Sequence, residues 1–492
     1  MNRRLFCRGA LATSVAAAYP ALTYWPHAAL AATETDTSIA AVSLDGAEIE
    51  LERAAVNDLG KRLSGQLVLS GHPQYDDARK VWNGMFDKRP ALIARCLSDE
   101  DVSHAVTFAR ERRLLTAVRG GGHSWPGKSV CDRGLMIDLS QMNAVKVDRG
   151  TRRAVAKGGA LLNMLDTAAL ENGLVTTAGV VSHTGVGGYT LGGGFGRVNR
   201  KYGLTIDNLK SVRIVTADGR VRRASADEEP DLFWALRGGG GNFGVATEFE
   251  YQLHPFDRML LSGSIVWPFK QAREVLEFYA DWSSRLSDEM YVGPVIVPHP
   301  ELGEVIIMDV VYIGDAAAGE KELAPLRKIG TPAADGVKVQ DHMFMQTVND
   351  GVFHHGVRSY AKNAMIRQWS QGLVNAIIDA YEPRVFLANH VAGGAVKRVG
   401  ELDTAFPHRN AETMLVIGSV WEDAAQDESM TAATRALYKA IEPFTGGYYD
   451  NIDFDGSGVD GNFGPAYPRL SKVKGKYDPG NLFRLNSNIK PA

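Results

Sequence analysis

The sequence predicts an α+β fold in two parts, the second of which contains an antiparallel sheet covered by helices. Short apolar segments with strand periodicity alternate with amphipathic helical segments over residues 80–257, a pattern typical of a mixed domain. Three glycine clusters, at 120–122, 185–196 and 238–244, interrupt this stretch. Beyond it the clusters stop and longer strand patterns follow. We therefore expect a first domain over 80–257 and a second over 258–444.

The first domain opens with a strand–helix–strand unit that ends in a glycine loop. A strand is predicted at 91–95. Ser98, with Asp101 three residues later, forms a capping-box pattern at the start of the next helix. A second strand at 115–119 runs directly into the glycines 120–122. The remaining elements are predicted as strands at 135–139, 154–157, 212–216 and 245–253, helices at 160–171 and 230–236, and a hairpin turn at Asp218-Gly219.

The second domain is predicted from its longer strand patterns, which indicate an antiparallel sheet. These strands are expected at 260–267, 290–297, 305–312, 385–390 and 414–421. Two further segments flank the domains. Residues 32–79 are expected to form a loose, helical lead-in. Residues 445–492, which are rich in aromatic side chains and Asn, are expected to return to the first domain.

The N-terminus resembles a twin-arginine export signal over residues 1–31. Arg3 and Arg4 precede an Ala-rich stretch, and Ala29-Leu30-Ala31 has the pattern of a cleavage site. A disordered basic tail or a membrane anchor are the alternatives, although Pro20 and Pro26 disfavour a spanning helix. We expect a periplasmic or secreted protein, exported folded and with no stable membrane insertion after signal removal. Sequencing of the mature N-terminus checks this expectation.

Composition and charge exclude several classes of function. The net charge is −3, without the basic excess of a nucleic-acid binder. With three cysteines the chain is no disulfide-built scaffold. Cys7 lies in the signal, and Cys96 and Cys131 are expected to be buried free thiols rather than a bridged pair. The pair His354-His355 has no further ligands nearby in the sequence, so we expect a loop and no metal site.

The glycine clusters predict backbone that approaches a ligand closely. The loop 120–122 can form an anion-binding nest or a simple tight turn. The cluster 185–196 contains glycine spacings seen in dinucleotide-binding sites, but it follows no strand in a βαβ unit and no acidic partner stands at the required spacing. The sequence therefore disfavours NAD. Three separate glycine loops instead indicate a long ligand that the backbone contacts at several points.

Several motifs together resemble one enzyme family. The segment RGGGHSWPG at 119–127 is similar to the flavinylation loop of the vanillyl-alcohol oxidase type FAD-binding fold, and in particular to the berberine bridge enzyme-like FAD-linked oxidoreductases. The resemblance extends to the bacterial 6-hydroxy-D-nicotine oxidase branch. Supporting segments are RPALIARC at 89–96, Gly203-Leu204 with Asp207-Asn208, LRGGGGNFG at 236–244, and NLFRLNSN at 481–488. The resemblance implies a two-part FAD-binding domain and a separate substrate domain.

The resemblance also implies which residues bind FAD. His123 would carry the flavin covalently. Val181 stands where bicovalent relatives have a Cys, so the second Cys linkage is absent and one covalent bond is expected. The other residues expected to contact FAD are Arg119, Gly120, Gly121, Gly122, Ser124, Gly179, Val180, Val181, Gly185, Gly188, Gly192, Gly244, Val245, Asn451, Arg484, Asn486 and Asn488. Arg484, Asn486 and Asn488 alternate, which predicts that they share one side of a strand.

Tyr449 is the candidate catalytic residue, because Tyr449-Asp450-Asn451 matches the family's Tyr-x-Asn motif. A phenol beside the flavin can take a proton from the substrate while hydride leaves for the flavin, either with a lowered pKa or in a concerted step. The neighbouring Tyr448 can take the same role, and both tyrosines can instead be core aromatics. Gly179 matches the position that controls dioxygen access in the family, or it is a turn glycine.

The expected function is an FAD oxidase that acts on a small alcohol, amine or sugar and is reoxidised by dioxygen to give hydrogen peroxide. One alternative is a flavin dehydrogenase with another electron acceptor. A second is a non-catalytic periplasmic binding protein that kept the fold. The sequence does not distinguish among substrates, because we find no motif in the second domain.

Overall fold

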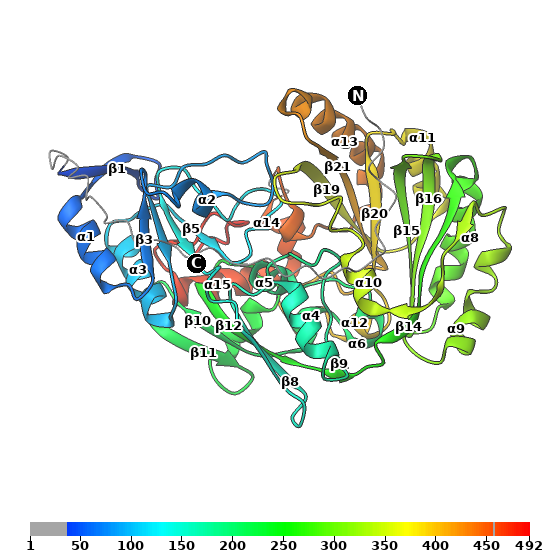
Figure 1. Cartoon of the computed structure of the whole chain (residues 1–492), viewed down its shortest axis with the longest axis horizontal. Helices are drawn as coiled ribbons and strands as arrows, with labels where there is room; N and C mark the ends of the chain where they lie inside the picture. Colours follow the sequence, from blue (N-terminus) through cyan, green and yellow to red (C-terminus); the bar gives the residue numbers. More distant parts are fainter. Residues whose placement is uncertain (1–36, 456–457) are drawn as a thin grey trace, which may run out of the picture. The chain divides into compact units, whose positions relative to one another are not determined.

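A four-stranded sheet near the start of the chain holds the first glycine loop. The computed structural model describes residues 37–455 and 458–492, so the expected signal at 1–31 lies outside the described residues. The strand order is β3-β4-β6-β5, with β4 and β5 parallel to β6. Strands β3 and β5 are labelled in Figure 1. The strands are β3 (Gln66–Leu69), β4 (Leu92–Arg95), β5 (Thr116–Arg119) and β6 (Leu135–Asp138). Glycines 120–122 therefore begin at the carboxyl edge of the parallel strands, where ligands commonly bind.

The lead-in contains strands as well as helices, which corrects the expectation of a loose, helical segment. Strands β1 (Ser38–Val42) and β2 (Glu48–Glu52) form a hairpin. The sequence Glu-Ile-Glu-Leu-Glu of β2 has the period-two alternation of a strand. Strand β3 then pairs with β4, which ties this segment to the first domain. Its helices are α1 (Arg53–Arg62) and α2 (Tyr75–Arg79).

A five-stranded antiparallel sheet follows, in the order β11-β10-β12-β8-β7. Its strands are β7 (Val145–Asp148), β8 (Arg153–Lys157), β10 (Leu209–Val215), β11 (Val221–Ser225) and β12 (Val245–Gln252). The helices around it are α3 (Asp99–Glu111), α4 (Leu162–Leu170), α5 (Val186–Gly192), α6 (Asn199–Tyr202) and α7 (Pro230–Leu236). Half of the predicted capping box is present, since Ser98 Oγ accepts a hydrogen bond of 3.1 Å from Asp101 N. The Asp101 carboxylate instead accepts from the backbone N–H of Leu97 at 2.8 Å. Gly219 takes the positive φ of the hairpin turn.

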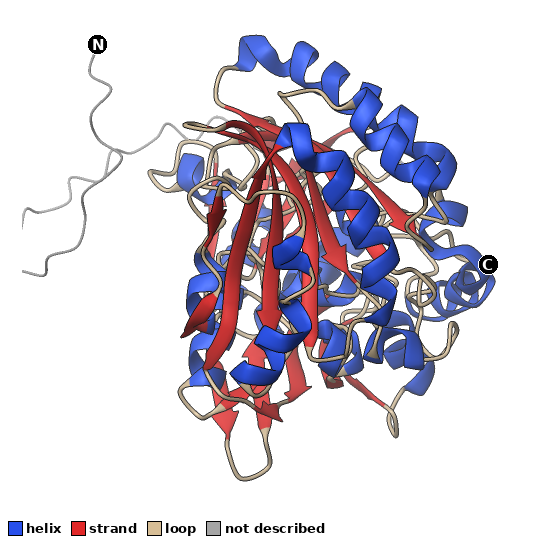
Figure 2. Cartoon of the chain, turned by 90° about the vertical axis from the view of Figure 1, so that its right-hand side faces the viewer, coloured by secondary structure: helices blue, strands red, loops and turns tan. Residues whose placement is uncertain are grey.

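An eight-stranded antiparallel sheet forms the second half of the chain, with the main path β17-β14-β16-β15-β20-β21-β19 and β18 paired to β14. Its strands are β14 (Met259–Pro268), β15 (Met290–His299), β16 (Gly303–Tyr312), β17 (Ala334–Asp335), β18 (Lys338–Asp341), β19 (Arg358–Ile366), β20 (Phe386–Val391) and β21 (Thr413–Trp421). Helices α8 (Ala272–Trp282), α11 (Gln371–Ala380) and α13 (Asp427–Ile441) cover one face (Figure 2). This agrees with the predicted antiparallel sheet covered by helices.

Strand β19 lies outside the predicted strands because polar residues interrupt its apolar pattern. Lys362 and Asn363 are both buried in it. The Lys362 ammonium contacts Asp455 at 3.2 Å, and Asn363 Nδ2 donates to the carbonyl of Tyr449 at 3.1 Å. These polar side chains therefore hold the C-terminal segment against the sheet.

The C-terminal segment contains α14 (Val459–Phe463) and α15 (Tyr467–Tyr477), and α15 packs against α7. Lys474 of α15 is fully buried. Its ammonium donates to the carbonyls of Asn242 at 2.6 Å and Phe483 at 2.9 Å, and it pairs with Asp478 at 2.7 Å. These bonds link the third glycine loop to the last residues of the chain.

The domain limits 80–257, 258–444 and 445–492 stay predictions. Among the described helices none is long and apolar enough to cross a bilayer.

Replacing Lys474 by Met is expected to destabilise the protein by about 3–5 kcal/mol, because the buried Asp478 carboxylate loses its counter-charge. The midpoint of urea unfolding, followed by circular dichroism at equal flavin content, measures the loss. Lys476→Met is the matched control on the same helix, since this lysine side chain is 61% exposed, and it should cost about 0.5 kcal/mol or less. Equal losses from both variants would show that the buried pair contributes nothing specific.

Candidate functional site

A cavity of about 630 Å³ lies between the glycine loops and the eight-stranded sheet, on the face of the sheet that α8, α11 and α13 do not cover. All three glycine clusters contribute to its wall, as do residues of β15, β16, β20 and β21. The wall therefore combines bare backbone on one side with the side chains of the large sheet on the other. Such a large, mostly apolar cavity with a few polar groups is the usual form of a ligand site.

His123 lies at the wall of this cavity, directly after the first glycine loop. Its ring stacks on Trp82 at 4.2 Å between centroids and contacts the ring of His183 at 5.0 Å. Burial, with a smaller contribution from His183 and His355, lowers the pKa of His123 to about 3. The imidazole is therefore neutral near pH 7, and its buried Nε2 has no hydrogen-bond partner among the described residues. A neutral, unpaired ring nitrogen of this kind can act as a nucleophile.

The glycines beside His123 let two chain segments meet and leave open backbone at the cavity. A Cβ at Gly121 would lie 2.5 Å from the Cα of Gly185, so both positions exclude a side chain. A Cβ at Gly188 would meet nothing within 4 Å, although Gly188 borders the cavity. Helix α5 begins directly after Gly185. The second glycine cluster thus begins a short helix, which was not expected from the sequence. This helix is not part of a βαβ unit in the described chain.

The loop around Gly179 is held by α10 (His342–Thr347) and by the segment that follows it. The carbonyl of Gly179 accepts a hydrogen bond of 3.0 Å from Gln346 Nε2, and the carbonyl of Val180 accepts one of 3.1 Å from Asn349. Ser182 binds the carboxylate of Asp350 through its backbone N–H at 2.8 Å and its hydroxyl at 2.6 Å. The backbone of this loop is therefore fixed beside the cavity.

Tyr449 lies at the cavity and is almost completely buried. Its hydroxyl oxygen accepts hydrogen bonds from Gly194 N at 3.2 Å and Asn451 Nδ2 at 2.9 Å. Burial raises the pKa of Tyr449 to about 12, so the phenol keeps its proton near neutral pH. Of the two possibilities for this residue, a concerted proton transfer therefore fits, and a resting phenolate does not.

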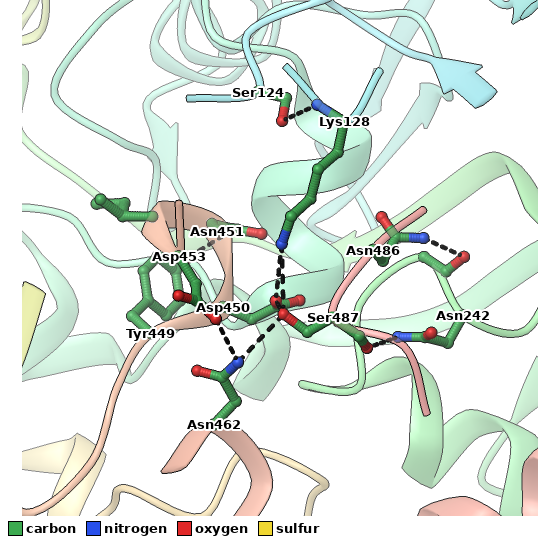
Figure 3. A network of polar contacts seen from close by, with 12 residues as sticks. Ser124, Lys128, Asn242, Tyr449, Asp450, Asn451, Asp453, Asn462, Asn486 and Ser487 are labelled. Carbon is green, nitrogen blue, oxygen red and sulfur yellow. Dashed lines mark hydrogen bonds and ion pairs between the residues drawn. The ribbon is translucent and has the colours of Figure 1, made fainter. Parts of the chain in front are cut away.

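A polar network connects the loop after His123 with the C-terminal segment (Figure 3). The Lys128 ammonium donates to Ser487 Oγ at 3.3 Å and pairs with Asp450 at 3.6 Å. Ser487 in turn donates a hydrogen bond to Asp450. Asn486 Nδ2 donates to the carbonyl of Gly241 at 2.9 Å. Segments 120–128, 240–242 and 449–487 are thus joined around the cavity.

Comparisons with known proteins agree with this arrangement. Residues 90–225 match a family model for an FAD binding domain, and residues 451–490 match one described as berberine and berberine like. The chain is 31% identical to (R)-6-hydroxynicotine oxidase of Paenarthrobacter nicotinovorans over 448 residues, which cover 87% of this chain and 97% of that protein. It belongs to the berberine bridge enzyme-like FAD-linked oxidoreductases.

Further relatives support the same family and fold. An FAD-linked oxidoreductase of Dictyostelium discoideum is 30% identical over 445 residues, with 89% of this chain and 97% of that protein covered. The crystal structure of 6-hydroxy-D-nicotine oxidase from Arthrobacter nicotinovorans superposes with a TM-score of 0.80 at 31% identity, covering 87% of this chain and 98% of that one. The predicted family, the fold class and the assignment as an FAD-dependent oxidoreductase are thereby confirmed.

The cavity fits the FAD of this oxidoreductase family. A long cofactor can lie along bare backbone at Gly188, Gly240 and Gly241, all of which border the cavity. His123 also borders the cavity, and its Nε2 has no hydrogen-bond partner among the described residues. When bound, FAD supplies the hydride acceptor of the reaction.

Most of the residues expected from the sequence to contact FAD or to act in catalysis border the cavity. These are Gly120, Gly121, Gly122, His123, Ser124, Gly179, Val180, Val181, Gly185, Gly188, Gly244, Tyr449, Asn451 and Asn486. The structure does not bring Arg119, Gly192, Val245, Tyr448, Arg484 and Asn488 to the wall. A Cβ at Gly192 would collide with the side chain of Asn451, so Gly192 packs against this residue of the wall without bordering the cavity itself.

Arg484 points away from the cavity, and the expected strand over 484–488 is absent. Its guanidinium donates to the carbonyls of Asn481 at 2.9 Å and Leu44 at 3.0 Å. The backbone bends over 485–487, which breaks the extended conformation that the alternation assumed. Tyr448 also lies elsewhere, with its ring against Gly461. Of the two candidate tyrosines only Tyr449 borders the cavity.

The aromatic and imidazole side chains around His123 were not predicted from the sequence. Trp82 precedes the glycine loop at 120–122 by about forty residues in the chain, and nothing in its local sequence indicates a site. His183 directly follows the Gly179–Ser182 run, and its ring contacts that of His355 at 4.9 Å. The His354-His355 pair is therefore close to His123, with His354 bonded to Glu422 at 2.9 Å. Cys96 and Cys131 are buried free thiols, as expected.

Proposed function

We propose that this FAD-linked oxidoreductase carries its FAD covalently on His123, through a single bond, and oxidises a small alcohol, amine or sugar. In this proposal bound FAD would accept hydride from the substrate, and dioxygen would then take the two electrons from the reduced flavin and be reduced to hydrogen peroxide. The unpaired, neutral imidazole of His123 beside the glycine loops is the observation that carries the covalent bond. Val181 supports a single bond, because it offers no thiol at the cavity.

Tyr449 and Asn451 supply the proton chemistry in this proposal. Asn451 and the backbone N–H of Gly194 both donate to the phenol oxygen, so the Tyr449 proton is free to be shared with a substrate hydroxyl or amine. The same two donors stabilise negative charge that develops on the phenol as it takes part in proton transfer. Tyr449 thereby orients the substrate and relays one proton in concert with hydride loss: the phenol passes its own proton to water and takes the hydroxyl or amine proton of the substrate, so the residue ends the step protonated.

Anaerobic mixing of the purified holoenzyme with a panel of alcohols, amines and sugars tests the proposal. A substrate should bleach the oxidised flavin absorption, and admission of air should restore the colour with release of one peroxide per turnover. Bleaching that only a quinone reverses would replace the oxidase with the dehydrogenase alternative. Failure of every compound class to bleach the flavin would contradict the proposed chemistry.

Replacing Gly179 by Val is expected to slow reoxidation of the flavin by dioxygen. A Cβ at this position would already lie 3.0 Å from Leu162 Cδ1 and 3.1 Å from Tyr189 Cε2, so the two methyl groups of Val must enter the space at the cavity wall. We expect the stopped-flow rate constant for reoxidation to fall by about tenfold or more, or about 1.4 kcal/mol in activation free energy.

The reductive half-reaction is the internal control for this variant, because anaerobic bleaching by substrate should change little. Gly336→Val is the matched control in the large sheet, where the nearest contact of the added Cβ is 3.5 Å away. If Gly179→Val reoxidises as fast as the wild type, Gly179 serves only as a small residue in a turn.

A further inference from the structure

One wall of the cavity carries a cluster of three polar side chains that the proposed chemistry leaves without a role. Arg197, between α5 and α6, reaches the large sheet and its Nε donates to Asp309 Oδ2 of β16 at 2.8 Å. His390 of β20 borders the same part of the cavity. We call Arg197, Asp309 and His390 the polar end of the cavity.

The polar end is buried and incompletely hydrogen-bonded. The side chains of Arg197 and Asp309 are 3% and 14% exposed. Arg197 Nη1 donates to the carbonyl of Met345 at 2.6 Å, whereas Nη2 makes no hydrogen bond to any described residue. His390 Nδ1 is likewise without a partner in the described part of the chain. Buried polar groups are normally paired, so these free donors and acceptors point to a ligand.

The polar end stands about one aromatic ring away from the proposed proton-transfer site. The ring of Phe195 contacts Tyr449 at 5.5 Å between centroids and His390 at 6.3 Å. The neighbouring wall of the cavity is apolar and is formed by Phe195, Val295, Ile307, Phe386, Met414 and Val416. Arg384 also borders the cavity, but it is half exposed and paired with Glu382 at 2.5 Å. A molecule that reacts beside Tyr449 therefore extends over an apolar wall to the polar end.

The charges at the polar end cancel. Arg197 is cationic and Asp309 anionic, and the two are in contact. Burial and the nearby Arg197 lower the pKa of His390 to about 4, so this imidazole is neutral near pH 7. A carboxylate placed here would be opposed by Asp309, and an ammonium group by Arg197. A buried charge without its own counter-charge is costly, whereas an uncharged group with a donor and an acceptor can satisfy both residues.

We propose that the polar end recognises an uncharged hydrogen-bonding group, such as a carboxamide or hydroxyl, on the far end of an aromatic or alicyclic substrate. This inference rests on the proposed function, since it assumes that the cavity beside Tyr449 binds the substrate. It narrows the substrate to molecules with an oxidisable group at one end, an apolar middle and a neutral polar group at the other. Arg197, Asp309 and His390 are specificity-determining residues in this view.

Three nearly isosteric probes test the charge preference: benzamide is neutral, benzoate anionic and benzamidine cationic near neutral pH. Each is titrated into the oxidised holoenzyme while the visible flavin spectrum is recorded. Benzamide should bind at least about tenfold more tightly than either charged probe. Tightest binding of a charged probe, equal binding of all three, or no spectral change with any of them overturns the proposal.

Two variants should reverse the preference in opposite directions. Asp309→Asn leaves Arg197 without its counter-charge, so benzoate should become the tightest probe, by about tenfold. Arg197→Met leaves Asp309 alone and should favour benzamidine. Asp335→Asn is the matched control, because Asp335 pairs with Arg327 at 2.7 Å on the same sheet but outside the cavity, and it should keep the wild-type order. If Arg197→Met does not fold, the wild type and Asp309→Asn decide the question.

The titration needs no turnover, which separates this inference from the proposed function. A protein that prefers benzamide but transfers no hydride would contradict the proposed function and keep the polar end. A protein that oxidises substrates but shows no preference among the probes would support the proposed function and contradict the role of the polar end.

Discussion

His123→Ala is expected to bind FAD without any covalent bond, so that acid precipitation leaves a colourless pellet and a yellow supernatant. In the wild type the flavin should stay with the denatured protein and give a fluorescent band after denaturing electrophoresis. The reason is the position of the imidazole, which borders the cavity, is stacked on Trp82 and has a buried Nε2 without a hydrogen-bond partner among the described residues. The glycine loops that border the cavity remain in the variant, so non-covalent binding should persist.

His354→Ala is the control for this experiment. Its imidazole belongs to the same group of histidines, but it bonds to Glu422 and is 48% exposed. This variant should keep the fluorescent band. Covalent flavin that survives in His123→Ala would place the attachment on another residue, and covalent flavin lost from both variants would indicate a general folding defect.

The regular elements and the glycine loops could be predicted from the sequence because both depend on local signals. The cap at Ser98, the turn at Gly219 and the alternation in β12 are determined by residues close together in the chain. The RGGGHSWPG motif likewise lies in one continuous segment, 119–127. These features therefore need no knowledge of tertiary contacts.

The parts that could not be predicted depend on contacts between distant segments. Trp82, His183 and His355 meet His123 only after folding, and no periodicity connects them. Strand β19 contains Lys362 and Asn363, which are satisfied by Asp455 and by the carbonyl of Tyr449. Before those partners are known, the same residues indicate a solvent-exposed loop.

Arg484 shows the opposite error, in which a local pattern was given too much weight. Arg484, Asn486 and Asn488 alternate, but the carboxylate of Asp478 accepts the backbone N–H groups of Leu482 and Phe483 at 2.8 and 2.9 Å. These bonds form a turn just before Arg484, and the backbone bends again over 485–487 instead of continuing as a strand. Only Asn486 of the three then borders the cavity, so period-two alternation failed where a buried carboxylate organises the backbone.

The second large effect is expected from Tyr449→Phe, which removes the hydroxyl that we propose shares a proton with the substrate. The rate constant for anaerobic flavin reduction should fall by roughly 10²–10⁴, the usual contribution of a positioned acid–base group. The visible flavin spectrum should change little, because the ring of Phe fills the same space against Phe195. Stopped-flow measurement at saturating substrate separates this chemical step from substrate binding.

Tyr448→Phe is the matched control, since its ring packs on Gly461 and does not border the cavity. It should alter the rate by about twofold or less, the equivalent of about 0.5 kcal/mol.

The pH dependence of flavin reduction gives an independent check. Because burial raises the pKa of Tyr449 to about 12, its phenol stays protonated from neutral pH to well above pH 10, so its ionisation should add no rise in the reduction rate over that range. A rise with an apparent pKa near 9 that disappears in Tyr449→Phe would show instead that the phenolate is the base, and a larger loss in Tyr448→Phe would transfer the role to its neighbour.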